Sequence, residues 1–175
     1  METVRSAALP NVLKLCASPV LQGIALKSLL EVLQGLVAVG SDGLTFGDLL
    51  GALTGLIDES LPRSAIANLA KCTAELCAHA PAASRDTQVT QLVSKMQSSE
   101  GRARQHALLC VGELGEKSDL SAVPNVQGII LGAFESPDEE TKSCAAYALG
   151  RSAVGDMGAR LGPVCTEQIG SYYVP

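Results

Sequence analysis

The residues best suited to chemistry are the cysteines and the two histidines, His79 and His106. A cysteine nucleophile needs a nearby base, and histidine can serve as one near neutral pH. Cys110 follows His106 by four residues, so both would lie on one face of a continuous helix. Cys110 also sits in an alanine-rich and leucine-rich pattern, which favours buried packing over a catalytic dyad. We therefore predict no catalytic residues, with a reactive-thiol enzyme as the alternative to test.

A metal site is the second chemistry to consider, because Cys72, Cys77 and His79 lie close together in the sequence. A structural metal site needs about four convergent ligands. The chain has no second cluster of this kind and no C-x-x-C pair, so we predict no metal. In an intracellular chain we expect the scattered thiols to be small buried side chains. The six cysteines are Cys16, Cys72, Cys77, Cys110, Cys144 and Cys165.

A phosphate-binding loop could lie in the stretch GSDGLTFG, residues 40–47, which precedes a predicted helix. The stretch lacks the G-x-x-x-x-G-K-[ST] pattern and has no preceding strand. We interpret it as a loop between helices and predict no bound cofactor and no small-molecule substrate.

Carboxylates gather at two predicted turns, Asp58-Glu59 and Asp138-Glu139-Glu140. Negative charge near a helix N-terminus stabilises the helix, so local capping is one role for these groups. Docking to a basic partner surface is the other, because the turns of a helical array are exposed and charged rims steer association. The sequence leaves both roles open.

Composition restricts the class of protein. The chain has 175 residues, of which 47% are hydrophobic and only 3% aromatic, so we expect closely packed helices rather than a β-sandwich or barrel. The net charge of −5 and the absence of a Lys/Arg run argue against direct nucleic-acid binding. No apolar stretch approaches the length needed to cross a bilayer, and we recognise no signal peptide. We expect no membrane partner and a location in the cytoplasm and nucleus.

The apolar residues recur with a helical period in four successive segments, at i, i+3, i+4 and i+7. The fourth segment carries a stripe of small residues, which allows a neighbouring helix to approach closely. The four stripes are Leu26, Leu29, Leu30, Leu33, Leu36 and Val37; Ile66, Leu69, Ala70, Thr73, Leu76 and Cys77; Ala103, Ala107, Cys110, Val111 and Leu114; and Thr141, Ala145, Ala148, Leu149 and Ser152.

A shorter apolar segment precedes each of these helices and is predicted to be the first helix of a pair. These segments are 9–16, 49–57, 89–96 and 126–134, with connections at 40–43, 80–84 and 116–121. Ser-Pro or Ser-x-Pro sequences mark the start of three second helices, and Ser136 with Glu139 predicts a capping box. We expect about four helix pairs plus a partial fifth, with a solenoid over 1–155 and an irregular tail over 156–175.

The segments 98–115 and 136–155 repeat at an offset of 38, which aligns Ala107 with Ala145 and Gly112 with Gly150. Such an offset between helical segments is typical of a helical-repeat array. The stretch IILGAFESPDEETKSCAAYALGRSAV, residues 129–154, resembles a HEAT repeat. That resemblance implies an all-α HEAT-repeat solenoid, an α-α superhelix, in which alanines allow stacking and Lys142 reaches a partner at a repeat boundary.

Four stretches of the sequence resemble one particular family of HEAT-repeat proteins. SPVLQGIAL (18–26), the run Ala70-Lys71-Cys72, ALLCVGELGEKSDLS (107–121) and SPDEETKSCAAYALGRSAVG (136–155) look like consecutive segments of the cullin-associated, neddylation-dissociated proteins. The resemblance implies an interior piece of a long, non-catalytic solenoid that wraps a cullin–RING-box complex and promotes exchange of substrate receptors. The alternative is another HEAT adaptor, of the nuclear transport receptor or phosphatase scaffold type.

Overall fold

The structure is a computed structural model that describes residues 9–39, 45–118, 120 and 123–155. The predicted partial fifth pair and the predicted tail, 156–175, lie outside the described residues. Cys165 lies outside them as well.

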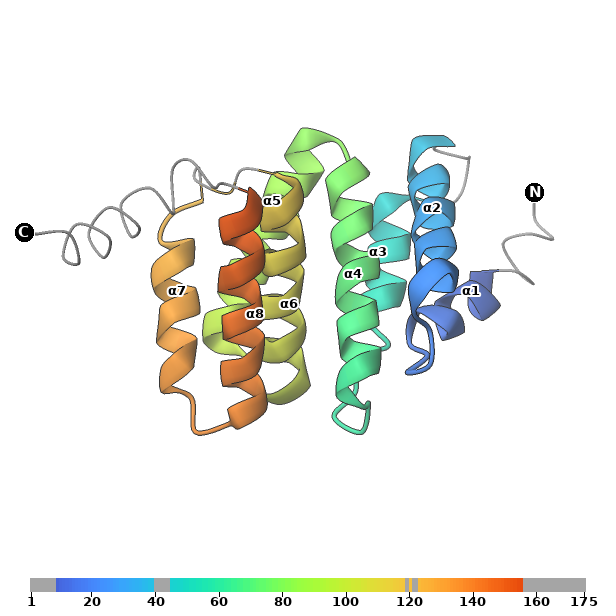
Figure 1. Ribbon diagram of the computed structural model, residues 1–175. Coiled ribbons are helices and arrows are strands. Elements are labelled where there is room, and N and C mark those ends of the chain that lie inside the picture. Colours follow the sequence, from blue (N-terminus) through green and yellow to red (C-terminus); the bar gives the residue numbers. More distant parts are fainter. Residues whose placement is uncertain (1–8, 40–44, 119, 121–122, 156–175) are drawn as a thin grey trace, which may run out of the picture.

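Within the described residues the chain forms eight α-helices arranged as four antiparallel pairs (Figure 1). Each pair has a shorter or more exposed first helix and a long second helix, and the second helices lie side by side along the molecule. This arrangement confirms the predicted all-α solenoid. The helices are α1 (Leu9–Cys16), α2 (Gly23–Val39), α3 (Phe46–Thr54), α4 (Arg63–His79), α5 (Ala82–Ser98), α6 (Gly101–Lys117), α7 (Val126–Gly132, continued by the 3-10 turn Ala133–Glu135) and α8 (Glu139–Gly155).

The four second helices are equally long, at 17 residues each. Helices α4, α6 and α8 begin 38 residues apart, and α2 begins 40 residues before α4. The sequence offset of 38 is therefore the structural period of the array. A residue in one second helix has a defined equivalent in each of the others.

Helix α4 is buried on two sides and joins two hydrophobic clusters. Its residues Leu69, Cys72 and Leu76 pack with side chains of α1, α2 and α3. Its residues Ala70 and Ala74 pack into the second cluster, which α4 shares with the last two pairs. Eleven residues of α4 are buried, and α6 buries eleven as well. Burial on both sides is what a helix inside a stacked array requires, because each pair covers its neighbour's apolar face.

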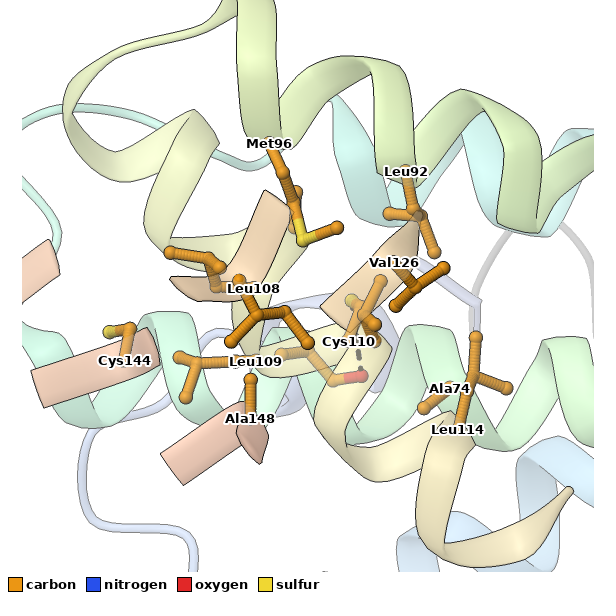
Figure 2. Close-up of a cluster of buried hydrophobic side chains, with 14 of the residues drawn as sticks. Ala74, Leu92, Met96, Leu108, Leu109, Cys110, Leu114, Val126, Cys144 and Ala148 are labelled. Atoms are coloured by element: carbon orange, nitrogen blue, oxygen red, sulfur yellow. Dashed lines mark hydrogen bonds between the residues drawn. The ribbon is translucent and has the colours of Figure 1, made fainter. Parts of the chain in front are cut away.

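The seam between α6 and α8 is the closest approach of two second helices, and small residues permit it. A Cβ added to Gly112 would lie 2.7 Å from the Cα of Ala148, and one added to Gly115 would lie 2.5 Å from the Oγ of Ser152. The predicted stripe of small residues is buried at Thr141, Ala145, Ala148 and Ser152. Figure 2 shows Leu108 and Leu109 of α6 in the cluster that Cys144 and Ala148 of α8 border.

The capping box predicted at Ser136 and Glu139 is wrong. Asp138 caps α8 instead: its carboxylate accepts hydrogen bonds from the backbone N–H groups of Glu140, at 3.2 Å, and Thr141, at 3.0 Å. Ser136 accepts a bond from the backbone of Asp138 and so shapes the turn before the helix. Since aspartate and serine are both good N-caps, composition alone did not decide between them. A capping box does occur at α3, between Thr45 and Asp48.

Helix α5 also differs from prediction, because it begins at Ala82 within the expected connection 80–84. Pro81 directly precedes the helix with φ −53°, which is already close to the helical value, and two alanines follow it. The break expected from Pro81 is therefore the start of the helix rather than a longer loop.

Candidate functional site

His106 and Cys110 do lie together, as their spacing predicts, with 3.4 Å between Nε2 and Sγ. Both side chains are buried in the α4–α6 interface, at 1% and 0% exposure. His106 Nε2 also lies 3.3 Å from the Oγ1 of Thr73, and the thiol of Cys110 donates to the carbonyl of Ala70. His106 and Cys110 of α6 therefore form side-chain contacts with α4.

The protonation states of this pair do not suit nucleophilic catalysis. Burial, aided by the positive charge of Lys95, lowers the pKa of His106 to about 4, so the imidazole is neutral near pH 7. Burial raises the pKa of the Cys110 thiol well above its usual value, so it stays protonated. A buried neutral imidazole beside a buried thiol provides packing and hydrogen bonds rather than an accessible thiolate.

The other described cysteines are buried and free, which confirms the expectation for Cys16, Cys72, Cys77 and Cys144. Burial raises the pKa of Cys77 to about 12 and also raises the pKa of Cys144. A hydrogen bond with Cys16, together with burial, raises the pKa of Cys72. Cys72, Cys77 and Cys144 are therefore protonated thiols at neutral pH, whereas the hydrogen bond with Cys72 lowers the pKa of Cys16.

We expect alkylation of the native protein to modify these five cysteines slowly and only as fast as the fold opens. The measurement is peptide-resolved mass spectrometry after a timed exposure to iodoacetamide, with the urea-unfolded chain as the control. Rapid and selective labelling of Cys110 in the native protein would overturn the structural interpretation of the pair.

Cys72, Cys77 and His79, which the sequence analysis considers as a metal site and rejects, do not converge in the structure. The imidazole of His79 instead lies 3.4 Å from the carboxylate of Glu75, one turn earlier in α4. Among the residues that the structure covers, no three of His, Cys, Asp and Glu are grouped so that they could hold a metal ion. None of the described helices is long and apolar enough to cross a membrane.

Polar side chains connect successive pairs along the edge formed by the turns between first and second helices. Glu59, in the turn before α4, accepts hydrogen bonds from the backbone N–H of Arg102 at the start of α6, at 3.1 and 3.3 Å. Arg102 in turn pairs with Glu140 at the start of α8. A carboxylate from one pair therefore satisfies the helix N-terminus of the next.

A second set of polar contacts lies nearer the C-terminal ends of α6 and α8. The buried carboxylate of Glu113 accepts from Arg151, at 2.9 Å, and from the hydroxyl of Tyr147. Lys117 pairs with Glu75 across the α4–α6 seam. These contacts hold neighbouring second helices in a fixed register, because each joins residues of different pairs.

Sequence reasoning missed these connections, although a signal for two of them exists. Arg102 and Glu140 are 38 residues apart, and so are Glu113 and Arg151. Opposite charges at equivalent positions of consecutive repeats are brought together by stacking. Lys142, which was expected to reach across a repeat boundary, instead pairs with Glu139 within α8, at 2.7 Å.

Local capping, one of the two predicted roles, is confirmed for the acidic turn 138–140, whereas the turn 58–59 gives α4 no side-chain cap. Asp58 accepts hydrogen bonds from Ser60, which lower the pKa of its carboxyl group, and Asp138 caps α8. The turns nevertheless leave acidic side chains exposed along one edge of the array. Asp58, Glu100, Glu135 and Glu139 are exposed there. A docking role for this acidic edge stays a prediction.

No family model matches the chain. It is 37% identical over 174 residues to cullin-associated NEDD8-dissociated protein 1 of Arabidopsis thaliana. The proteins of the same name from Dictyostelium discoideum and Drosophila melanogaster are each 30% identical, over 169 and 179 residues. The chain is homologous to a segment of the cullin-associated NEDD8-dissociated proteins.

The homology covers nearly all of the chain but little of these relatives. The matches span 95% of the chain for the Arabidopsis and Dictyostelium proteins and 92% for the Drosophila protein, and 14% of each relative. The cullin-associated NEDD8-dissociated proteins are thus about seven times longer than the aligned segment. This agrees with the expectation of a piece of a longer solenoid.

Proposed function

We propose that the chain is a non-catalytic, protein-binding scaffold segment of a cullin-associated regulator. The observation that carries the proposal is 37% identity over 95% of the chain to a protein named as cullin-associated. The fold supports it, because stacked helix pairs display an extended surface on which a protein partner can lie. The partner would be a cullin–RING-box complex, and the process would be assembly of cullin-RING ubiquitin ligases with exchange of their substrate receptors.

The proposal is tested by capture of purified cullin–RING-box complex on immobilised 1–175, with and without the ubiquitin-like modifier on the cullin. We expect retention of the unmodified complex and reduced retention of the modified one. Retention of neither form would contradict cullin binding by this segment. Recovery from extract of transport cargo or phosphatase subunits, without cullin, would favour another class of HEAT adaptor.

The same assay tests whether the acidic edge takes part. The double variant Glu100→Gln/Glu139→Gln removes two exposed charges, neither of which forms a contact between helix pairs in the described structure. The control, Gln91→Lys/Gln97→Lys on the exposed side of α5, changes the net charge equally. If the edge faces a basic partner surface, only the first variant should slow association and weaken its salt dependence.

A further inference from the structure

Two of the buried cysteines lie against each other across the seam between the first and second helix pairs. Cys16 is the last residue of α1, and Cys72 lies in the middle of α4. Both side chains belong to the same hydrophobic cluster, both are 0% exposed, and the two thiols share a hydrogen bond. The fold therefore holds together two sulfur atoms that are far apart in the sequence.

No other two of the cysteines that the structure describes are hydrogen-bonded to each other. The thiol of Cys110 donates to the carbonyl of Ala70 and lies beside His106. Cys77 and Cys144 are buried without a hydrogen bond to another thiol. Among the described seams, only the first brings one thiol into a position to react with a second.

The contact makes the two thiols chemically unequal. The hydrogen bond from Cys72 stabilises the thiolate of Cys16 and lowers its pKa, although burial acts in the opposite direction. The same hydrogen bond and burial raise the pKa of Cys72. Cys16 is thus the better nucleophile of the pair at neutral pH, and Cys72 is a second thiol already in place beside it.

We propose that Cys16 and Cys72 are a redox-sensitive pair, which a low-molecular-weight disulfide oxidises to a disulfide that joins the first helix pair to the second. The proposal depends on the contact between the two thiols, on their burial in one cluster and on their origin in different pairs. This inference does not depend on the proposed function.

The reaction is a thiol–disulfide exchange in two steps. The thiolate of Cys16 attacks one sulfur of the small disulfide, which forms a mixed disulfide and releases one small thiol. The sulfur of Cys72 then attacks the sulfur of Cys16 and displaces the second small thiol, which takes the proton of Cys72. The two protein thiols lose two electrons, and the small disulfide gains them and leaves as two thiols.

Both thiols are buried, so the oxidation has to wait for a local opening of the first seam. Helix α1 has only eight residues, and a short helix detaches at a lower free energy than the whole fold unfolds. Once formed, the disulfide closes a long loop in the unfolded chain and holds α1 on α4. Oxidation therefore locks two consecutive pairs together, and reduction releases them.

The test equilibrates the full chain 1–175 with reduced and oxidised glutathione at a series of ratios. Every sample carries Cys165→Ser, so that only the five described thiols can react. The remaining thiols are blocked in urea, and the unreduced peptides are identified by mass spectrometry. We expect one dominant linked pair, Cys16 with Cys72, and a higher urea midpoint for the oxidised chain than for the reduced chain. Oxidation in urea should instead give a mixture of pairs.

The variants Cys16→Ala and Cys72→Ala should each lose the linked pair and the rise in urea midpoint on oxidation. Cys144→Ala, which removes another buried thiol, is the matched control and should keep both. Circular dichroism of the reduced variants shows whether they are folded, and the linked peptide of the parent chain decides the result where a variant is not. A folded chain that forms no Cys16–Cys72 disulfide at any ratio would overturn the proposal. So would the same mixture of pairs in the folded and the unfolded chain.

Discussion

Replacement of Gly112 by alanine is expected to lower the free energy of unfolding by about 1–3 kcal/mol, the usual cost of overpacking a closely packed interior. The new Cβ would lie 2.7 Å from the Cα of Ala148, which is backbone and cannot rotate away. Helices α6 and α8 would have to separate, and the contacts of Glu113 with Tyr147 and Arg151 join the same two helices. Urea unfolding followed by circular dichroism measures the loss.

Gly150→Ala is the matched control, because Gly150 occupies the equivalent position one repeat later and has open space around its Cα. Alanine there removes only the entropic penalty of a helical glycine and should stabilise the protein by about 0.5–1 kcal/mol. The same substitution is thus expected to change stability in opposite directions at two positions that the sequence aligns. Equal changes in stability at Gly112 and Gly150 would show that α6 and α8 pack less closely than the structure indicates.

The helix pairs could be predicted because their signals are local. The apolar period located the second helices, and the small residues of α8 indicated a close neighbour on the correct face. In α4 the stripe Ile66, Leu69, Ala70, Thr73, Leu76 and Cys77 is entirely buried. The pattern does not say that opposite sides of that stripe serve two different clusters. That division depends on how the pairs stack.

The contacts between pairs were not predicted, because their partners are distant in sequence and polar residues carry no periodic signature. Glu59 and Arg102, which join at the start of α6, are 43 residues apart. The sequence predicts that the acidic turn containing Glu59 is a local cap or a docking site, whereas the carboxylate of Glu59 bonds to the N-terminus of the helix of the next pair. Asp138 was grouped with its neighbours, although its geometry makes it the N-cap of α8.

The period supplies a rule that would have recovered part of this information. Once the offset of 38 is known, each charged residue can be compared with its equivalent in the following repeat. Arg102 with Glu140 and Glu113 with Arg151 then stand out as opposite charges that stacking brings together. The comparison of charged residues does not find the contact of Glu59, because Glu59 accepts from a backbone N–H, which almost any residue could provide.

The buried histidine makes stability depend on pH in a defined window. The pKa of His106 is about 4 in the folded protein and near 6.5 in the unfolded chain, because burial disfavours the imidazolium. Above pH 6.5 both states are neutral and the full stability is present. As the pH falls from 6.5 to 4 the unfolded chain binds a proton that the folded protein does not. The fold should lose about 3 kcal/mol over that interval through this group.

The experiment measures the free energy of unfolding of the parent chain and of His106→Asn from pH 7.5 to 4.5. The difference between the two pH dependences is the contribution of His106. The variant replaces His106 with the residue type that α4 carries at the equivalent position, Asn68. It should be less stable near neutral pH but fall less steeply on acidification. The lowered pKa values of Asp58 and Asp138 act at lower pH, and His106→Asn retains both groups. Parallel curves for the parent chain and His106→Asn would mean that the imidazole is solvated and that the α4–α6 seam opens to water.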